Sequence, residues 1–101
     1  MAQALIWSEE ALDDVDRIAE YIGRDSPYHA QQVAEHLFDL AGELPAHPEL
    51  GRIVPELADP KVRERFLYSY RLIYELGDEE IHILAVIHGK RLLESLDRFN
   101  D

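Results

Sequence analysis

The chain has 101 residues, a formal net charge of −11 and no cysteine. This length suits one independently folding domain spanning 1–101, and the absence of thiols excludes cysteine-ligated metal sites and thiol nucleophiles. The acidity argues against a general nucleic-acid binder, which needs surplus Lys and Arg for phosphate contacts. Since no apolar run is long enough to span a membrane and the N-terminus lacks the features of a signal peptide, we expect a cytoplasmic protein.

The first half of the chain predicts one strand followed by two helices. Residues 3–7 are short and apolar, and Ser8 after them suits a helix N-cap. Apolar side chains then recur at helical spacing until Gly23, where we expect the first helix to end. Pro27 stands at the favoured first position of a second amphipathic helix, expected to run to about Leu44. The short link predicts an antiparallel hairpin, whose outer side carries solvated acids: Glu9, Glu10, Asp13, Asp14 and Asp16.

The second half predicts a connector and three strands. Residues 45–60 hold four of the five prolines and form the connector. Strands are expected at 62–67, 70–76 and 80–88, which are rich in Val, Ile, Tyr and Phe and separated by short turns. The tail at 92–99 is expected to add one or two helical turns. The order β-α-α-β-β-β predicts a two-layer α+β fold, in which the helical hairpin packs on one face of a mainly antiparallel sheet.

The alternation of side chains along a strand predicts which residues face the helices. In the strand 70–76 every second residue is apolar, which leaves Arg71 on the uncovered face. In the strand 80–88 the isoleucines are expected to meet the helices, which leaves His88 on the same open face. The prediction is a concave surface made by Arg63, Arg65, Arg71 and His88, with Lys90 and Arg91 at its rim.

Structural roles account for the same residues. Arg71 could form an ion pair with Glu75 or with a carboxylate of the connector, and His88 could be a structural histidine at a strand end. His29 and His36 lie seven residues apart on a predicted helix, about 10 Å from each other, which is too far to share a metal ion. We therefore predict no metal site and no cofactor.

Five short segments stand out along the chain: Trp7-Ser8, Arg24-Asp25-Ser26-Pro27, Pro48-Glu49-Leu50-Gly51-Arg52, Tyr70-Arg71-Leu72-Ile73-Tyr74 and His88-Gly89-Lys90-Arg91. In this order and spacing they resemble the RelE/ParE toxins of bacterial type II toxin–antitoxin systems, and ParE-like members more closely. No single segment is specific, because PELG or HGKR occurs by chance, but together they extend over almost the whole chain.

The resemblance implies a toxin that a cognate antitoxin neutralises by wrapping its C-terminal segment around it, in a heterotetramer or larger complex. It implies no sequence-specific DNA binding by the toxin alone. ParE-like toxins inhibit DNA gyrase by binding, and this is the expected function. The alternatives are a family member that has lost toxicity and a RelE-like endonuclease that cuts mRNA on the ribosome. In the endonuclease, Arg71 matches the phosphate-binding arginine and His88 lies where some members place an acid/base residue. The residues expected to bind target or antitoxin are Arg63, Arg65, Arg71, Lys90 and Arg91.

Overall fold

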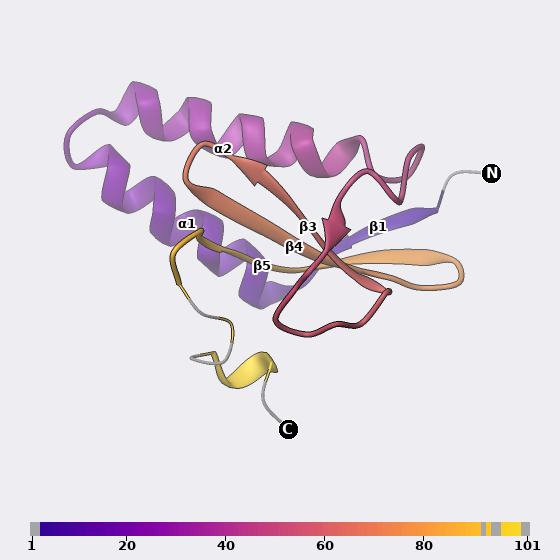
Figure 1. Ribbon diagram of the computed structural model, residues 1–101. Helices are drawn as coiled ribbons and strands as arrows, with labels where there is room; N and C mark the ends of the chain where they lie inside the picture. Colours follow the sequence, from indigo (N-terminus) through magenta and orange to yellow (C-terminus); the bar gives the residue numbers. More distant parts are fainter. Residues whose placement is uncertain (1–2, 92, 94–95, 100–101) are drawn as a thin grey trace.

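The computed structural model describes residues 3–91, 93 and 96–99. The elements are β1 (Ala4–Trp7), α1 (Glu9–Gly23), α2 (Pro27–Gly42), β2 (Arg52–Ile53), β3 (Val62–Leu67), β4 (Tyr70–Leu76), β5 (Glu80–His88) and a short 3₁₀ helix, η2 (Asp97–Phe99). The two helices pack on a five-stranded mixed sheet, which confirms the predicted α+β fold. Figure 1 shows them side by side over the sheet. No helix within the described residues is long and apolar enough to cross a membrane.

Both helices begin at the predicted serine caps. The Ser8 Oγ accepts a hydrogen bond from the Ala11 N–H at 3.0 Å, and the Ser26 Oγ accepts one from the His29 N–H at 3.2 Å. Each cap satisfies a backbone donor that the first helical turn leaves without a partner. The second helix ends at Gly42, two residues before the predicted Leu44, which packs in the core instead.

The strands lie in the order β1-β5-β4-β3-β2. The first strand forms one edge and pairs parallel with β5, from Ala4 opposite Glu80 to Trp7 opposite Ile83, and the remaining pairs are antiparallel. A β-bulge interrupts the β4–β5 pair, because Ile73 lies opposite Ala85 whereas Tyr74 lies opposite Ile83. One residue of β5, Leu84, is therefore extra, and side chains beyond it change face relative to a regular strand.

Apolar side chains fill both faces of the sheet. Between the helices and the sheet lies a core that includes Val15, Leu37, Leu72, Tyr74 and Ile83. A second cluster covers the opposite face, where the connector and the tail contribute the side chains of Val54, Leu57, Leu93, Leu96 and Phe99. The prediction of an uncovered sheet face is therefore wrong for the described part of the chain, since the connector and the tail cover it.

The connector is held to the sheet by Tyr74. Its buried hydroxyl donates a hydrogen bond to the Pro48 carbonyl and accepts one from the Gly51 N–H, both at 2.8 Å. Burial raises the pKa of Tyr74. A Cβ at Gly51 would lie 2.6 Å from the Glu64 carbonyl oxygen and 2.7 Å from the tyrosine hydroxyl, so only glycine fits this close approach.

The tail returns toward the first helix, near which η2 lies in Figure 1. The predicted helix at 92–99 falls partly on 92, 94 and 95, which lie outside the described residues. Within the described tail, helical structure is assigned to η2 and to residue 93.

Candidate functional site

Arg71 lies in a buried ionic cluster and not on an open surface. Its Nε donates to the Glu64 Oε1 at 2.7 Å, and its Nη1 and Nη2 donate to the two Glu56 carboxylate oxygens at 2.9 and 2.8 Å. The arginine is 5% exposed, and the side chain of Glu64 is fully buried. The two carboxylates raise the pKa of Arg71, and the hydrogen bond from Arg71 lowers the pKa of Glu56. The structure thus contains the ion pair between Arg71 and a connector carboxylate, Glu56, that the sequence left open as an alternative.

Arg63 and Arg65 lie on the helix side of the sheet, away from Arg71. They sit opposite Tyr74 and Leu72 in the β3–β4 register, and both of these residues belong to the helix-side core. Arg65 donates to the Leu40 carbonyl at 3.2 Å and to the Glu43 carboxylate at 3.1 Å, at the C-terminal end of α2. A cation there is favoured by the helix dipole. Arg63 donates to the Gly51 carbonyl at 3.0 Å.

His88 also lies on the helix side, because the bulge at Leu84 reverses the alternation of β5. The residue opposite it is Tyr70, whose ring meets the imidazole edge-on at 6.1 Å between centroids. Directly opposite residues in a sheet share a face. The predicted convergence of Arg63, Arg65, Arg71 and His88 is therefore wrong, since Arg71 faces the tail and the other three face the helices.

A pocket opens where β5 ends beside α1. It has a volume of about 340 Å³, and its lining includes Arg17, Tyr21, Tyr70, His88 and Arg91, which we call the strand-end pocket. Tyr21 is 69% exposed. His88 and Arg91 were expected at a functional surface, whereas Arg17, Tyr21 and Tyr70 were not. The sequence signal that could have indicated this pocket is the spacing of Arg17 and Tyr21, which are four residues apart and therefore lie on one face of the first helix.

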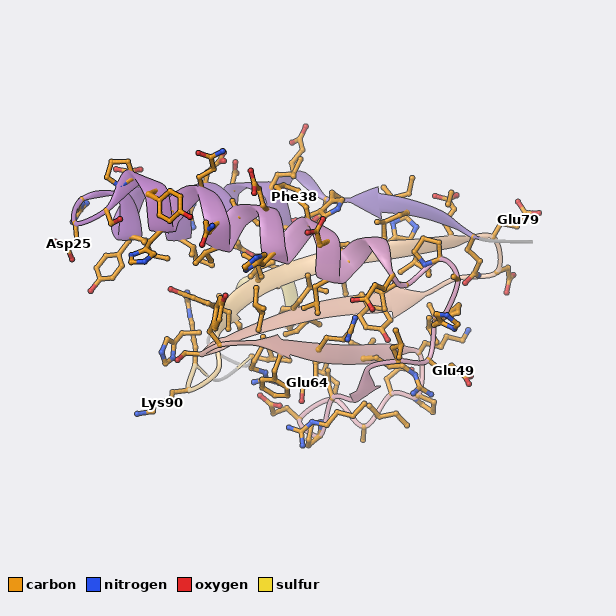
Figure 2. The ribbon with its side chains drawn as sticks, turned by 90° about the horizontal axis from the view of Figure 1, so that it is seen from above. Asp25, Phe38, Glu49, Glu64, Glu79 and Lys90 are labelled. Atoms are coloured by element: carbon orange, nitrogen blue, oxygen red, sulfur yellow. The ribbon has the colours of Figure 1, made fainter. Side chains whose placement is uncertain are left out.

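The other predicted cation, Lys90, is exposed at the same end of the sheet. Figure 2 shows Lys90 and Glu79 at opposite ends of the sheet. The backbone N–H of Lys90 donates a hydrogen bond to the His88 Nδ1 at 3.2 Å. In a neutral imidazole the proton is then on the other ring nitrogen, Nε2. His88 is exposed, so this ring can exchange hydrogen bonds with a partner.

Asp14 connects α1, β5 and the tail, and is not a solvated surface acid. The Asp14 carboxylate accepts a hydrogen bond from the Val86 N–H at 3.0 Å, beyond the end of β1. It also accepts two hydrogen bonds from the Arg98 guanidinium, at 2.8 and 3.1 Å. Arg98 also donates to the Leu84 carbonyl at 3.0 Å. Asp14 and Arg98 thus satisfy backbone groups of β5 that β1 does not reach, and Asp14 raises the pKa of Arg98. The prediction of a solvated Asp14 is wrong because this residue faces the sheet and is 7% exposed.

Within the described residues, no three His, Asp or Glu side chains lie close enough together to hold a metal ion. The chemistry available at the strand-end pocket is that of exposed cations, aromatic rings and one imidazole, and the Asp14 carboxylate in its wall is engaged by Arg98. Such a surface can recognise carboxylates or phosphates together with apolar groups.

A family model described as the ParE toxin of the type II toxin–antitoxin system parDE matches residues 5–93. The chain belongs to this toxin family. The ParE-family chain is 38% identical over 93 residues to Toxin RelE2 of Caulobacter vibrioides, which covers 91% of this chain and the whole of that relative. The resemblance to RelE/ParE toxins seen in the sequence is confirmed.

Solved structures share the fold of this ParE-family toxin. A chromosomal ParDE system from P. aeruginosa matches with a TM-score of 0.72 and 22% identity, covering 86% of this chain and 96% of that one. E. coli RelE, solved as a mutant in the free state, has a TM-score of 0.64 and 22% identity, with 89% and 86% covered. The RelBE2 toxin–antitoxin complex of Mycobacterium tuberculosis gives 0.59 and 21%, with 87% and 99% covered.

Proposed function

We propose that this ParE-family toxin acts by binding a protein target, DNA gyrase, and does not cut RNA. The observation that carries the proposal is the state of Arg71. An endonuclease of this superfamily would use that arginine on the scissile phosphate, and a cation does so only when its donors are free to reach the phosphate. Here Arg71 is buried and its donors are occupied by Glu56 and Glu64.

The two residues that an endonuclease would pair lie on opposite faces of the sheet. Arg71 lies opposite Ile87, which belongs to the tail-side core, whereas His88 lies opposite Tyr70 on the helix side. A general acid and a phosphate-binding cation must reach the same phosphate. This arrangement opposes a joint role for Arg71 and His88 in cleavage.

The net charge of −11 supports a protein target as well, because an acidic chain is repelled by the phosphates of mRNA and ribosomal RNA. The second partner is a cognate antitoxin, as the family implies. With Arg63, Arg65 and Arg71 engaged inside the molecule, the exposed cations of the strand-end pocket, Arg17 and Arg91, are the better candidates for its acidic residues.

The strand-end pocket also favours one alternative, a ribosome-dependent endonuclease built without Arg71. It gathers the cations Arg17 and Arg91 around the exposed imidazole of His88 and the rings of Tyr21 and Tyr70. In that mechanism His88 would be the general acid or base, and its replacement would cost about 10²–10⁴-fold in rate.

The test compares two activities of the same purified chain: inhibition of DNA supercoiling by gyrase, and cleavage of mRNA bound to ribosomes. We expect inhibition of supercoiling and no cleavage. The variant His88→Ala should retain inhibition within about threefold, and Lys61→Ala, at the far end of β3, serves as the surface control. Ribosome-dependent cleavage that His88→Ala abolishes would establish the alternative and overturn the proposal.

A further inference from the structure

Tyr68 has an unfavourable backbone conformation that no burial offsets. It lies in the two-residue turn between β3 and β4 with a φ of 54°. Glycine adopts positive φ without steric cost, but a bulky side chain does not. Tyr68 is also 67% exposed, so its ring gains little from packing. Strained residues of this kind cluster at functional sites.

The ring of Tyr68 is held in place from α2. Its hydroxyl lies 3.0 Å from the His36 Nδ1, and the two rings are 6.2 Å apart between centroids. A side chain fixed before binding loses less entropy when a partner arrives. Tyr68 is therefore an exposed aromatic group that is already ordered.

A second exposed aromatic residue and a cation line a hollow together with Tyr68. A hollow of about 300 Å³ between the β3–β4 turn and the end of β5 is lined by Phe66, Tyr68, Ser69, His88, Gly89 and Lys90. We call Phe66, Tyr68 and Lys90 the turn patch. Phe66 is 49% exposed. Among the described residues, no carboxylate lines this hollow, although the chain carries 21 acidic residues.

We propose that the turn patch is the surface by which the toxin grips its target protein, receiving an apolar side chain that is flanked by a carboxylate. The inference rests on the proposed function in taking the target to be a protein. Ordered aromatic side chains are the groups that most often dominate protein–protein binding energy, and the acid would pair with Lys90. Lys90 and the Arg52 guanidinium, which lies 5.2 Å from the centre of the Phe66 ring, are two cations in a strongly acidic chain and release too few counterions to hold a nucleic acid.

The two non-glycine residues with positive φ in the described chain provide a matched pair of variants. They are Tyr68 and Ala58, whose φ is 52° and which lies in the connector. Glycine at either position relieves the strain, so Tyr68→Gly and Ala58→Gly should both melt at or above the temperature of the parent chain. Only Tyr68→Gly should lose growth arrest on induced expression at equal protein levels, and its inhibition of gyrase should fall at least tenfold. Tyr68→Asn is a second variant, because Asn also tolerates positive φ.

The charge of the turn patch is tested by Lys90→Glu against Lys61→Glu, which changes the net charge equally at the far end of β3. We expect only Lys90→Glu to lose growth arrest. The proposal is overturned if Tyr68→Gly and Lys90→Glu arrest growth as the parent does, or if the parent does not arrest growth. It is also overturned if the parent binds a ten-nucleotide single-stranded RNA in a Lys90-dependent manner. If the parent arrests growth without inhibiting gyrase, the proposed target is wrong, and the growth comparison of Tyr68→Gly with Ala58→Gly still decides the role of the turn patch.

Discussion

Replacing Asp14 by alanine should destabilise the protein far more than replacing any neighbouring acid. The change leaves the Val86 N–H without its acceptor at a site where Val86 is 2% exposed, which costs about 1–3 kcal/mol. It also removes the ion pair with Arg98, whose side chain is 17% exposed, so that screening by water limits this contribution to about 1 kcal/mol. The free energy of unfolding should fall by about 2–4 kcal/mol in total.

Urea denaturation followed by circular dichroism measures this loss, and the melting temperature should fall by roughly 10–25 °C. The matched control is Asp13→Ala, an exposed acid on the same helix, which should change stability by no more than about 0.5 kcal/mol. Arg98→Met leaves the Asp14 carboxylate, whose side chain is 8% exposed, with only the hydrogen bond from the Val86 N–H, and should also destabilise the protein. Equal, small effects at Asp13 and Asp14 would refute the assignment of Asp14 to the β5 edge and restore the solvated helix face.

Three further predictions concern the ionic cluster and the connector. Arg71→Met leaves the buried Glu64 carboxylate with only the pairing from Arg52 and should cost about 3 kcal/mol, most of which the double variant with Glu64→Leu should recover in chemical denaturation. The pKa of Glu56 is lowered below its ordinary 4.5, so its ion pair stabilises the fold above that pH and is lost as pH falls through the lower folded value. The melting temperatures of the parent and Glu56→Gln should therefore differ at pH 7 and converge as the solution is acidified below about pH 4. Gly51→Ala should destabilise strongly because its Cβ would clash with backbone, whereas Gly42→Ala meets nothing within 4 Å and should be neutral or mildly stabilising, as thermal melts will show.

The sequence predicts elements well because each is encoded by local signals. The three strands after the connector have the predicted bounds, and the capping serines begin both helices. The sequence does not predict which residues of β5 face the helices. Residues 83–87 are all apolar, so the sequence around Leu84 shows no change of alternation from which the bulge could be detected.

The candidate site was harder to predict because its residues depend on long-range contacts. Arg65 and Arg71 lie on opposite faces of the sheet because, in the β3–β4 register, Arg65 lies opposite Leu72 of the helix-side core and Arg71 lies opposite Phe66. The acids that occupy Arg71 come from β3 and from the connector, and only the former is close along the chain. Helical spacing places Asp14 on the same face as Ala11, Val15 and Ile18, but its partners at the β5 edge and in the tail are distant in the sequence and no local pattern identifies them.

The parallel pairing of β1 with β5 makes completion of the fold a late event during synthesis on the ribosome. The first strand gains its neighbour β5 only after β5 has emerged, and Asp14 meets Val86 and Arg98 across separations of 72 and 84 residues. Contacts of such long range slow folding, because a large loop must close before they form. A nascent chain that stops before β5 lacks both the edge of the sheet and the strand-end pocket. Translation products that end before β5 are therefore expected to be unfolded, so the strand-end pocket can form only after ribosomes have passed the end of β5.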